Sequence, residues 1–219
     1  MRDITIKICG LSTEETMRTA LDEGVDMVGL VFFPKSPRHV SLSAAAHLAD
    51  MARGKAEIVA LTVNMDLDGL SRIKELVRPD WFQLHGSEPV EAIAAIKVMH
   101  QVKIMKALAI SELADLEQAH MYGAVADRIL FDAKPPSGSE LPGGNGVSFD
   151  WTLLKDLDLA KPFMLSGGLT TENVSEAIEQ SGAAAIDVSS GVEREKGVKD
   201  SDLIRRFVAA ARGVTVAGE

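Results

Sequence analysis

The chain has 219 residues, of which 46% are hydrophobic and 25% charged, and these proportions are typical of a folded globular protein rather than a disordered one. Its 23 basic and 32 acidic residues give a formal net charge of −9, which argues against nucleic acid or an anionic membrane as a partner. The single cysteine, Cys9, cannot form an internal disulfide or a cysteine-based zinc site, and no apolar run approaches the length of a membrane span. We therefore expect a soluble, cytoplasmic protein.

Short apolar runs rich in valine and isoleucine alternate with amphipathic stretches along the chain. The runs predict eight β-strands at residues 4–8, 27–33, 58–63, 81–84, 102–108, 128–131, 162–165 and 184–188. Between the strands we expect about eight helices. One should begin after Ser12, with Glu15 completing a capping box, and another should end at Gly182.

Near-continuous apolar strands that alternate with helices are typical of a parallel sheet covered by helices. Eight such units close into a (β/α)8 TIM barrel, and we predict one α/β barrel domain over residues 1–219. An open, doubly wound sheet is the alternative, but no GxGxxG follows the first strand and no linker divides the chain. Residues 133–148 form the one long irregular segment, and loops of that length are usually functional.

In a barrel of this type the active site lies at the carboxyl ends of the strands. Cys9 follows the first predicted strand and is either a small buried hydrophobe or a thiolate favoured by a positive field. Asp132 follows the sixth and either pairs with a cation such as Lys106 or Lys134, or has a raised pKa and donates a proton. His85, after the fourth strand, is as readily a supporting residue as a catalytic one.

Two turns rich in glycine and serine follow the last two strands, at residues 166–168 and 187–191. Barrels with phosphorylated substrates often bind the phosphate between these turns, because glycine lets backbone N–H groups approach an anion. A plain tight turn is the alternative for the first of them. The predicted phosphate site comprises Gly167, Gly168, Ser189, Ser190 and Gly191, with Gly143, Gly144 and Gly146 closing over the ligand.

Arg38 lies on a loop stiffened by two prolines and carries a planar fork of donors that suits a carboxylate bound at two points. A solvated surface arginine is the alternative. No histidine shows metal-ligand spacing, and the pair Asp66 and Asp68 resembles the start of a helix more than a cation loop. The sequence therefore predicts no metal site.

Seven strings of the chain together resemble the phosphoribosylanthranilate isomerase family. The first and last, KICGL and DVSSGVE, are specific, whereas the Gly-Gly turn is shared with many phosphate-binding barrels. The resemblance runs from the first to the last predicted strand, through residues 7–11, 33–38, 83–86, 130–132, 143–151, 165–169 and 187–193.

This resemblance implies an isomerase of tryptophan biosynthesis that converts N-(5′-phosphoribosyl)anthranilate to 1-(2-carboxyphenylamino)-1-deoxyribulose 5-phosphate by an Amadori rearrangement, without a cofactor. It implies Asp132 as the general acid and Cys9 as the general base, with Arg38 as the ligand of the anthranilate carboxylate. Asp187 and His85 also match, as substrate-binding positions. The implied partner is a small phosphorylated substrate, bound by a monomer or a homodimer.

That chemistry requires Cys9 to be largely ionised and Asp132 to be protonated near neutral pH, so we expect a positive field at the thiol. A related sugar-phosphate isomerase of histidine synthesis is the alternative enzyme, but it would be expected to have an aspartate where this chain has Cys9. A non-enzymatic relative would be expected to lack one of the two proton-transfer residues.

Overall fold

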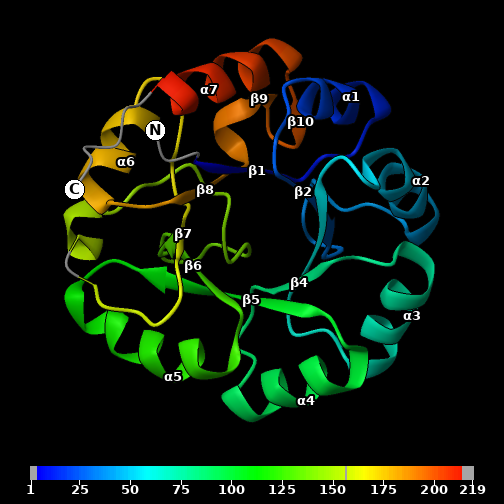
Figure 1. Cartoon of the computed structure of the whole chain (residues 1–219), viewed down its shortest axis with the longest axis horizontal. Coiled ribbons are helices and arrows are strands. Elements are labelled where there is room, and N and C mark those ends of the chain that lie inside the picture. Colours follow the sequence, from blue (N-terminus) through cyan, green and yellow to red (C-terminus); the bar gives the residue numbers. More distant parts are fainter. Residues whose placement is uncertain (1–3, 156, 214–219) are drawn as a thin grey trace.

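The computed structural model describes residues 4–155 and 157–213, and within them eight parallel strands form a closed barrel in chain order. Helices surround the barrel on its outer side (Figure 1), so the predicted (β/α)8 TIM barrel is confirmed. The strands are β1 (Thr5–Cys9), β2 (Met27–Phe32), β3 (Glu57–Thr62), β4 (Trp81–Leu84), β5 (Lys103–Ile110), β6 (Arg128–Ala133), β7 (Met164–Leu165) and β8 (Ala185–Val188).

The described residues form seven α-helices rather than the eight or so that we expected. They are α1 (Glu14–Asp22), α2 (Leu42–Ala52), α3 (Leu67–Val77), α4 (Val90–His100), α5 (Glu117–Val125), α6 (Val174–Ser181) and α7 (Ser201–Gly213). Short 3-10 helices add η1 (Leu113–Leu116) and η2 (Trp151–Leu154). Between β6 and β7 the described residues form only η2, because the preceding segment contains three prolines, which cannot donate the backbone bonds of a helix.

Most helix boundaries follow from local chemistry, and one differs from the prediction. The N-cap of α1 is Thr13, not Ser12, because Thr13 has the extended backbone that lets its hydroxyl accept from the free N–H of Thr16, at 3.3 Å. Asp66 caps α3 through the N–H of Gly69, which confirms the helix start predicted there. Gly182 ends α6 in the left-handed conformation, as expected.

Side chains of each strand alternate between the interior of the barrel and the surrounding helices. The larger hydrophobic core lies between strands and helices, and includes Ile8, Phe82 and Phe207. A smaller cluster draws on β2 to β8 and fills the barrel itself, which makes the interior a packed core rather than a channel. Its members are Met27, Val59, Trp81, Met105, Ala107, Leu130, Met164 and Ala185.

A two-stranded antiparallel sheet, which we did not predict, follows the barrel strands. After β8 the chain forms the 3-10 helix η3 (Ser190–Val192), then β9 (Glu193–Glu195) and β10 (Val198–Lys199). Strands of two and three residues are too short to give a periodic hydrophobic signal. The hairpin brings Glu193 and Lys199 next to the carboxyl end of the barrel, where they contact residues of the site.

None of the described helices is both long and apolar enough to cross a membrane.

Candidate active site

A pocket at the carboxyl ends of the strands collects most of the residues predicted to be functional. Of that set, Gly146 and Gly191 lie beside the described lining rather than in it. The predicted residues that line the pocket are Cys9, Arg38, His85, Asp132, Gly143, Gly144, Gly167, Gly168, Asp187, Ser189 and Ser190.

Three of these residues are parts of strands rather than of the loops that follow. Cys9 is the last residue of β1, Asp132 the fifth of six in β6, and Asp187 the third of four in β8. All three line the pocket, so their side chains face the barrel interior. A position within a hydrogen-bonded strand fixes a side chain more closely than a loop does, which favours these residues for proton transfer.

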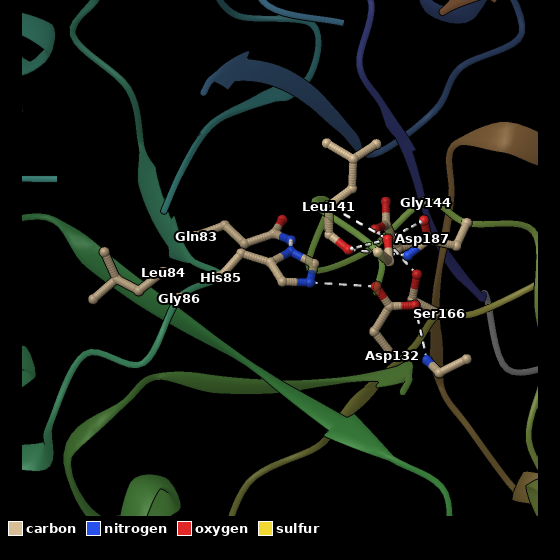
Figure 2. A network of polar contacts seen from close by, with 12 residues as sticks. Gln83, Leu84, His85, Gly86, Asp132, Leu141, Gly144, Ser166 and Asp187 are labelled. Atoms are coloured by element: carbon tan, nitrogen blue, oxygen red, sulfur yellow. Dashed lines mark hydrogen bonds and ion pairs between the residues drawn. The ribbon is translucent and has the colours of Figure 1, made fainter. Parts of the chain in front are cut away.

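His85 and Asp132 form a close pair, which Figure 2 shows with the imidazole pointing at the carboxylate. His85 Nε2 lies 3.3 Å from Asp132 Oδ2, and Ala133 donates its backbone N–H to Asp132 Oδ1 at 2.9 Å. Lys106 and Lys134 have other partners: Lys106 pairs with Glu88 and Lys134 with Asp115. Pairing of Asp132 with either lysine is therefore wrong.

The buried amide of Gln83 lies on the other side of the same imidazole, with its Nε2 at 3.1 Å from Nδ1 of His85. Two proton arrangements satisfy these positions. In one, the Gln83 amide donates to the ring and the ring donates to ionised Asp132. In the other, protonated Asp132 donates to the ring and the ring donates to a reversed Gln83 amide. The pair can therefore accommodate Asp132 with or without its proton, as an acid that releases a proton requires.

Cys9 is buried, with 4% of its surface exposed, and Gly29 of the neighbouring strand leaves room for its sulfur. A Cβ atom at Gly29 would lie 2.9 Å from Sγ of Cys9. Burial raises the pKa of the Cys9 thiol above its ordinary value, although the positive charges of Lys7 and Lys199 oppose that shift. The expected positive field is present, but burial, together with the negative charge of Asp187, outweighs it. The expectation of a largely ionised thiol near neutral pH is thus wrong for this structure.

Asp187 lines the pocket but also belongs to a buried ion pair. Its Oδ1 lies 2.8 Å from Nζ of Lys7, which is fully buried and lies opposite Asp187 in the pairing of β1 with β8. Its Oδ2 accepts a long hydrogen bond from the hydroxyl of Ser166, at 3.5 Å. The carboxylate therefore holds the Lys7 ammonium two residues before Cys9, and its role towards substrate stays a prediction.

Arg38 is buried rather than solvated, so the surface alternative is wrong. Its Nε and Nη2 donate to the two carboxylate oxygens of Glu193, at 2.7 and 2.9 Å, and Nη2 also donates to the carbonyl of Gly144 at 3.3 Å. One edge of the planar fork is thus occupied by the protein itself. Glu193 lies 155 residues from Arg38 and no local pattern joins them, so we did not predict this pair.

The turns predicted to bind phosphate come together on the side of β7 and β8. Gly167 and Gly168 both have the left-handed backbone that favours glycine, and a Cβ at Gly168 would lie 2.7 Å from the backbone of Val147. Ser189 donates its hydroxyl to the carbonyl of Cys9 at 3.1 Å, and η3 begins at the next residue. The turns after β7 and β8 therefore leave little room for side chains between them. Such a lack of side chains lets backbone N–H groups come close to an anion.

Of the three glycines expected to close over the ligand, two lie against side chains of other predicted site residues. A Cβ at Gly143 would lie 2.8 Å from Nε2 of His85, and one at Gly144 would lie 2.8 Å from Nη1 of Arg38. A Cβ at Gly146 would lie 3.9 Å from the hydroxyl oxygen of Ser190. The loop therefore lies over His85, Asp132 and Arg38.

The described residues contain no group of three or more histidine, cysteine, aspartate or glutamate side chains that could hold a metal ion.

Known proteins of one family are similar to this chain over most of its length. Residues 6–210 match the model of the N-(5′-phosphoribosyl)anthranilate (PRA) isomerase family. The chain is 54% identical over 212 residues to N-(5′-phosphoribosyl)anthranilate isomerase of Afipia carboxidovorans, covering 97% of this chain and 91% of that one.

Solved structures agree with this match. The phosphoribosyl anthranilate isomerase of Thermotoga maritima is 36% identical, with a TM-score of 0.85 and coverage of 96% of this chain and 99% of that one. A phosphoribosyl anthranilate isomerase in complex with reduced 1-(o-carboxyphenylamino)-1-deoxyribulose 5-phosphate is 33% identical, with a TM-score of 0.82 and the same coverage.

Proposed function

The chain belongs to the N-(5′-phosphoribosyl)anthranilate isomerase family, and we propose how its pocket carries out that family's reaction. It is an isomerase of tryptophan biosynthesis, which converts N-(5′-phosphoribosyl)anthranilate to 1-(2-carboxyphenylamino)-1-deoxyribulose 5-phosphate by an Amadori rearrangement. The observation that carries the mechanism is that the only thiol and a strand-held carboxyl group, Cys9 and Asp132, line one pocket together with the Arg38 guanidinium.

The first step is opening of the ribose ring. Asp132, in its protonated form, donates its proton to the ring oxygen while the bond from that oxygen to C1′ breaks. The lone pair of the anthranilate nitrogen forms the new double bond to C1′, which gives a protonated Schiff base. His85 supports the carboxyl group through its contact at 3.3 Å and can remain paired with it after the proton has left.

The second step is removal of the C2′ proton. Cys9, as the thiolate, takes this proton, and the electron pair of the C–H bond moves towards the positively charged nitrogen to give a neutral enolamine. The enolamine then tautomerises to the ketone product. The raised pKa of Cys9 makes its thiolate a stronger base when it forms, at the cost of a smaller ionised fraction at neutral pH.

The remaining predicted residues bind the two charged ends of the substrate. We assign the anthranilate carboxylate to Arg38 and the phosphate to the backbone N–H groups and hydroxyls around Gly167, Gly168, Ser189, Ser190 and Gly191, with Gly146 beside them. Asp187 supports this wall of the pocket through its pair with Lys7. A net acidic chain with a local cation suits a substrate that carries both anions.

Several further properties belong to the same proposal. We expect one domain over residues 1–219, a cytoplasmic location, no cofactor or metal requirement, no nucleic-acid partner, and a monomer or homodimer.

Expression of the chain should restore growth without tryptophan to a bacterial strain that lacks its own phosphoribosylanthranilate isomerase. The Asp132→Asn variant, expressed at the same level, is the matched control and should not restore growth. If neither the wild type nor the variant restores growth, the proposed function is contradicted. If both restore growth equally, the assignment of Asp132 as the acid is contradicted.

Arg38→Lys should weaken substrate binding more than it slows turnover. Lysine keeps the charge but cannot bond to Glu193 along one edge and to a carboxylate along the other. We expect KM to rise by roughly tenfold or more with kcat little changed, as steady-state kinetics would measure. An unchanged KM with a collapsed kcat would mean that Arg38 acts on the transition state instead.

Inorganic phosphate should inhibit the enzyme competitively with its substrate. The turns after β7 and β8 would hold phosphate as they hold the 5′-phosphate, through backbone donors. Initial rates at several phosphate and substrate concentrations, at constant ionic strength, would measure this effect. Inhibition that substrate does not relieve would contradict the assignment.

A further inference from the structure

Glu193, in β9, has its whole carboxylate occupied by buried donors. Oε1 accepts from Nε of Arg38 at 2.7 Å and from Nζ of Lys199 at 2.6 Å. Oε2 accepts from Nη2 of Arg38 at 2.9 Å and from the backbone N–H of Gly197 at 2.9 Å. The side chains of Glu193, Arg38 and Lys199 are 4%, 5% and 1% exposed. A carboxylate so fully bonded is unavailable to a substrate, but it fixes the groups around it.

Arg38 presents two hydrogen-bonding edges, and Glu193 takes one of them. The pair is bidentate along the edge made by Nε and Nη2, which sets both the position and the plane of the guanidinium. The other edge consists of Nη1 and the second proton of Nη2. It faces Gly144, whose carbonyl accepts from Nη2 at 3.3 Å and whose Cβ, if present, would lie 2.8 Å from Nη1.

We propose that Glu193 is a positioning residue for substrate recognition, which holds Arg38 so that its Nη1 group faces the pocket and binds the aromatic carboxylate of the substrate. The inference rests on the function proposed above, which supplies that carboxylate. An arginine side chain has four rotatable torsions, and holding it in its binding geometry beforehand avoids the entropy cost of ordering it with the substrate.

A chain of hydrogen bonds through Lys199 and Ser189 also connects Glu193 with the end of β1. Lys199 donates to the carbonyl and the hydroxyl oxygen of Ser189, at 2.8 and 3.1 Å, and Ser189 donates to the carbonyl of Cys9 at 3.1 Å. Burial opposes ionisation of Glu193, but the bonds from Arg38 and Lys199 outweigh it and lower the pKa of this carboxyl group to about 2, which keeps it ionised. Burial lowers the pKa of Lys199 to about 8, although the charge of Glu193 opposes that shift. The carboxylate of Glu193 therefore fixes the position of Arg38 relative to β1, the strand that carries Cys9.

The test compares two substrates, made by condensing ribose 5-phosphate with anthranilate or with aniline, which lacks the carboxylate. Glu193→Gln should raise KM for the anthranilate substrate by roughly tenfold or more, with kcat within about threefold. It should leave kcat/KM for the aniline substrate unchanged. Glu195→Gln, an exposed residue of the same strand, removes the same charge and should alter neither substrate's kinetics.

A double variant separates positioning from general support of the fold. In the Arg38→Ala background, Glu193→Gln should add no further rise in KM, because its effect passes through the guanidinium. Equal losses on both substrates, an unchanged KM, or a fall in kcat alone would each overturn the inference. If Glu193→Gln does not fold, Glu193→Asp keeps the charge but shortens the side chain, and an unchanged KM in that variant would also overturn it.

The wild-type chain decides the proposed function separately. Absence of turnover by the wild type would contradict the isomerase function itself. An active wild type with an unaffected Glu193→Gln variant would contradict only the positioning role.

Discussion

Replacing Cys9 with alanine should lower kcat by on the order of 100-fold or more, because alanine cannot accept the C2′ proton. Substrate binding should change little, since the carboxylate and phosphate ends are held by other residues. Steady-state rates, followed through loss of substrate fluorescence, would measure both quantities. Cys9→Ser is the matched variant: it nearly keeps the size of the side chain, but its hydroxyl ionises far less readily than a thiol, so it should be impaired as strongly.

The pH dependence of this effect follows from the direction of the pKa shift. Burial raises the pKa of Cys9, so the thiolate is a minor species at neutral pH and its fraction increases as pH rises towards the shifted value. We therefore expect kcat/KM of the wild type to increase with pH above neutrality, and the residual rate of Cys9→Ala to lack that rise. If Cys9→Ala kept nearly its full kcat, Cys9 would not be the base but an ordinary buried thiol. His85 or Asp187 would then be the next candidate for the base.

Asp132→Asn should also lower kcat by on the order of 100-fold or more, because an amide cannot transfer a proton to the ribose ring oxygen. Asparagine is nearly the same size and can still accept the Ala133 N–H, so we expect the pocket to keep its shape. Steady-state kinetics together with thermal unfolding would separate lost chemistry from lost folding.

Asp115→Asn is the control for this substitution. Asp115 lies in η1 and pairs with Lys134, outside the pocket lining, so its replacement should leave kcat and KM unchanged. If the Asp132→Asn variant folds and retains its kcat, the assignment of Asp132 as the general acid is contradicted. In that event the pairing of His85 with Asp132 would have to serve binding rather than proton transfer.

The barrel and its main side chains follow from local patterns. The eight apolar runs agree with β1 to β8 to within about two residues at every end, because a buried parallel strand must be apolar on both faces. Because the active site of such a barrel lies at the carboxyl ends of its strands, the strand positions and the alternation of side chains are enough to predict Cys9, Asp132 and Asp187. The strand after Pro162 is the shortest in the barrel, since a proline cannot donate to the ladder.

Other features depend on contacts that no local pattern carries. The pair of Arg38 with Glu193 joins residues far apart in the chain, and the polar contacts of His85 with Gln83 and Asp132 connect the end of β4 with β6. The direction of the Cys9 shift depends on whether burial or the two lysines dominates, which requires the packed structure. The place of Gly143 over the acid likewise depends on how a loop with several prolines folds back into the pocket.

The most direct test of the account is the loss of fluorescence of freshly prepared N-(5′-phosphoribosyl)anthranilate on addition of purified protein. The wild-type chain should consume the substrate and form the ribulose product, whereas a variant carrying both Cys9→Ala and Asp132→Asn, purified in the same way, should not exceed the spontaneous decay of the substrate. No consumption by the wild type, or equal consumption by the double variant, would contradict the claim that this pocket performs the isomerisation through Cys9 and Asp132.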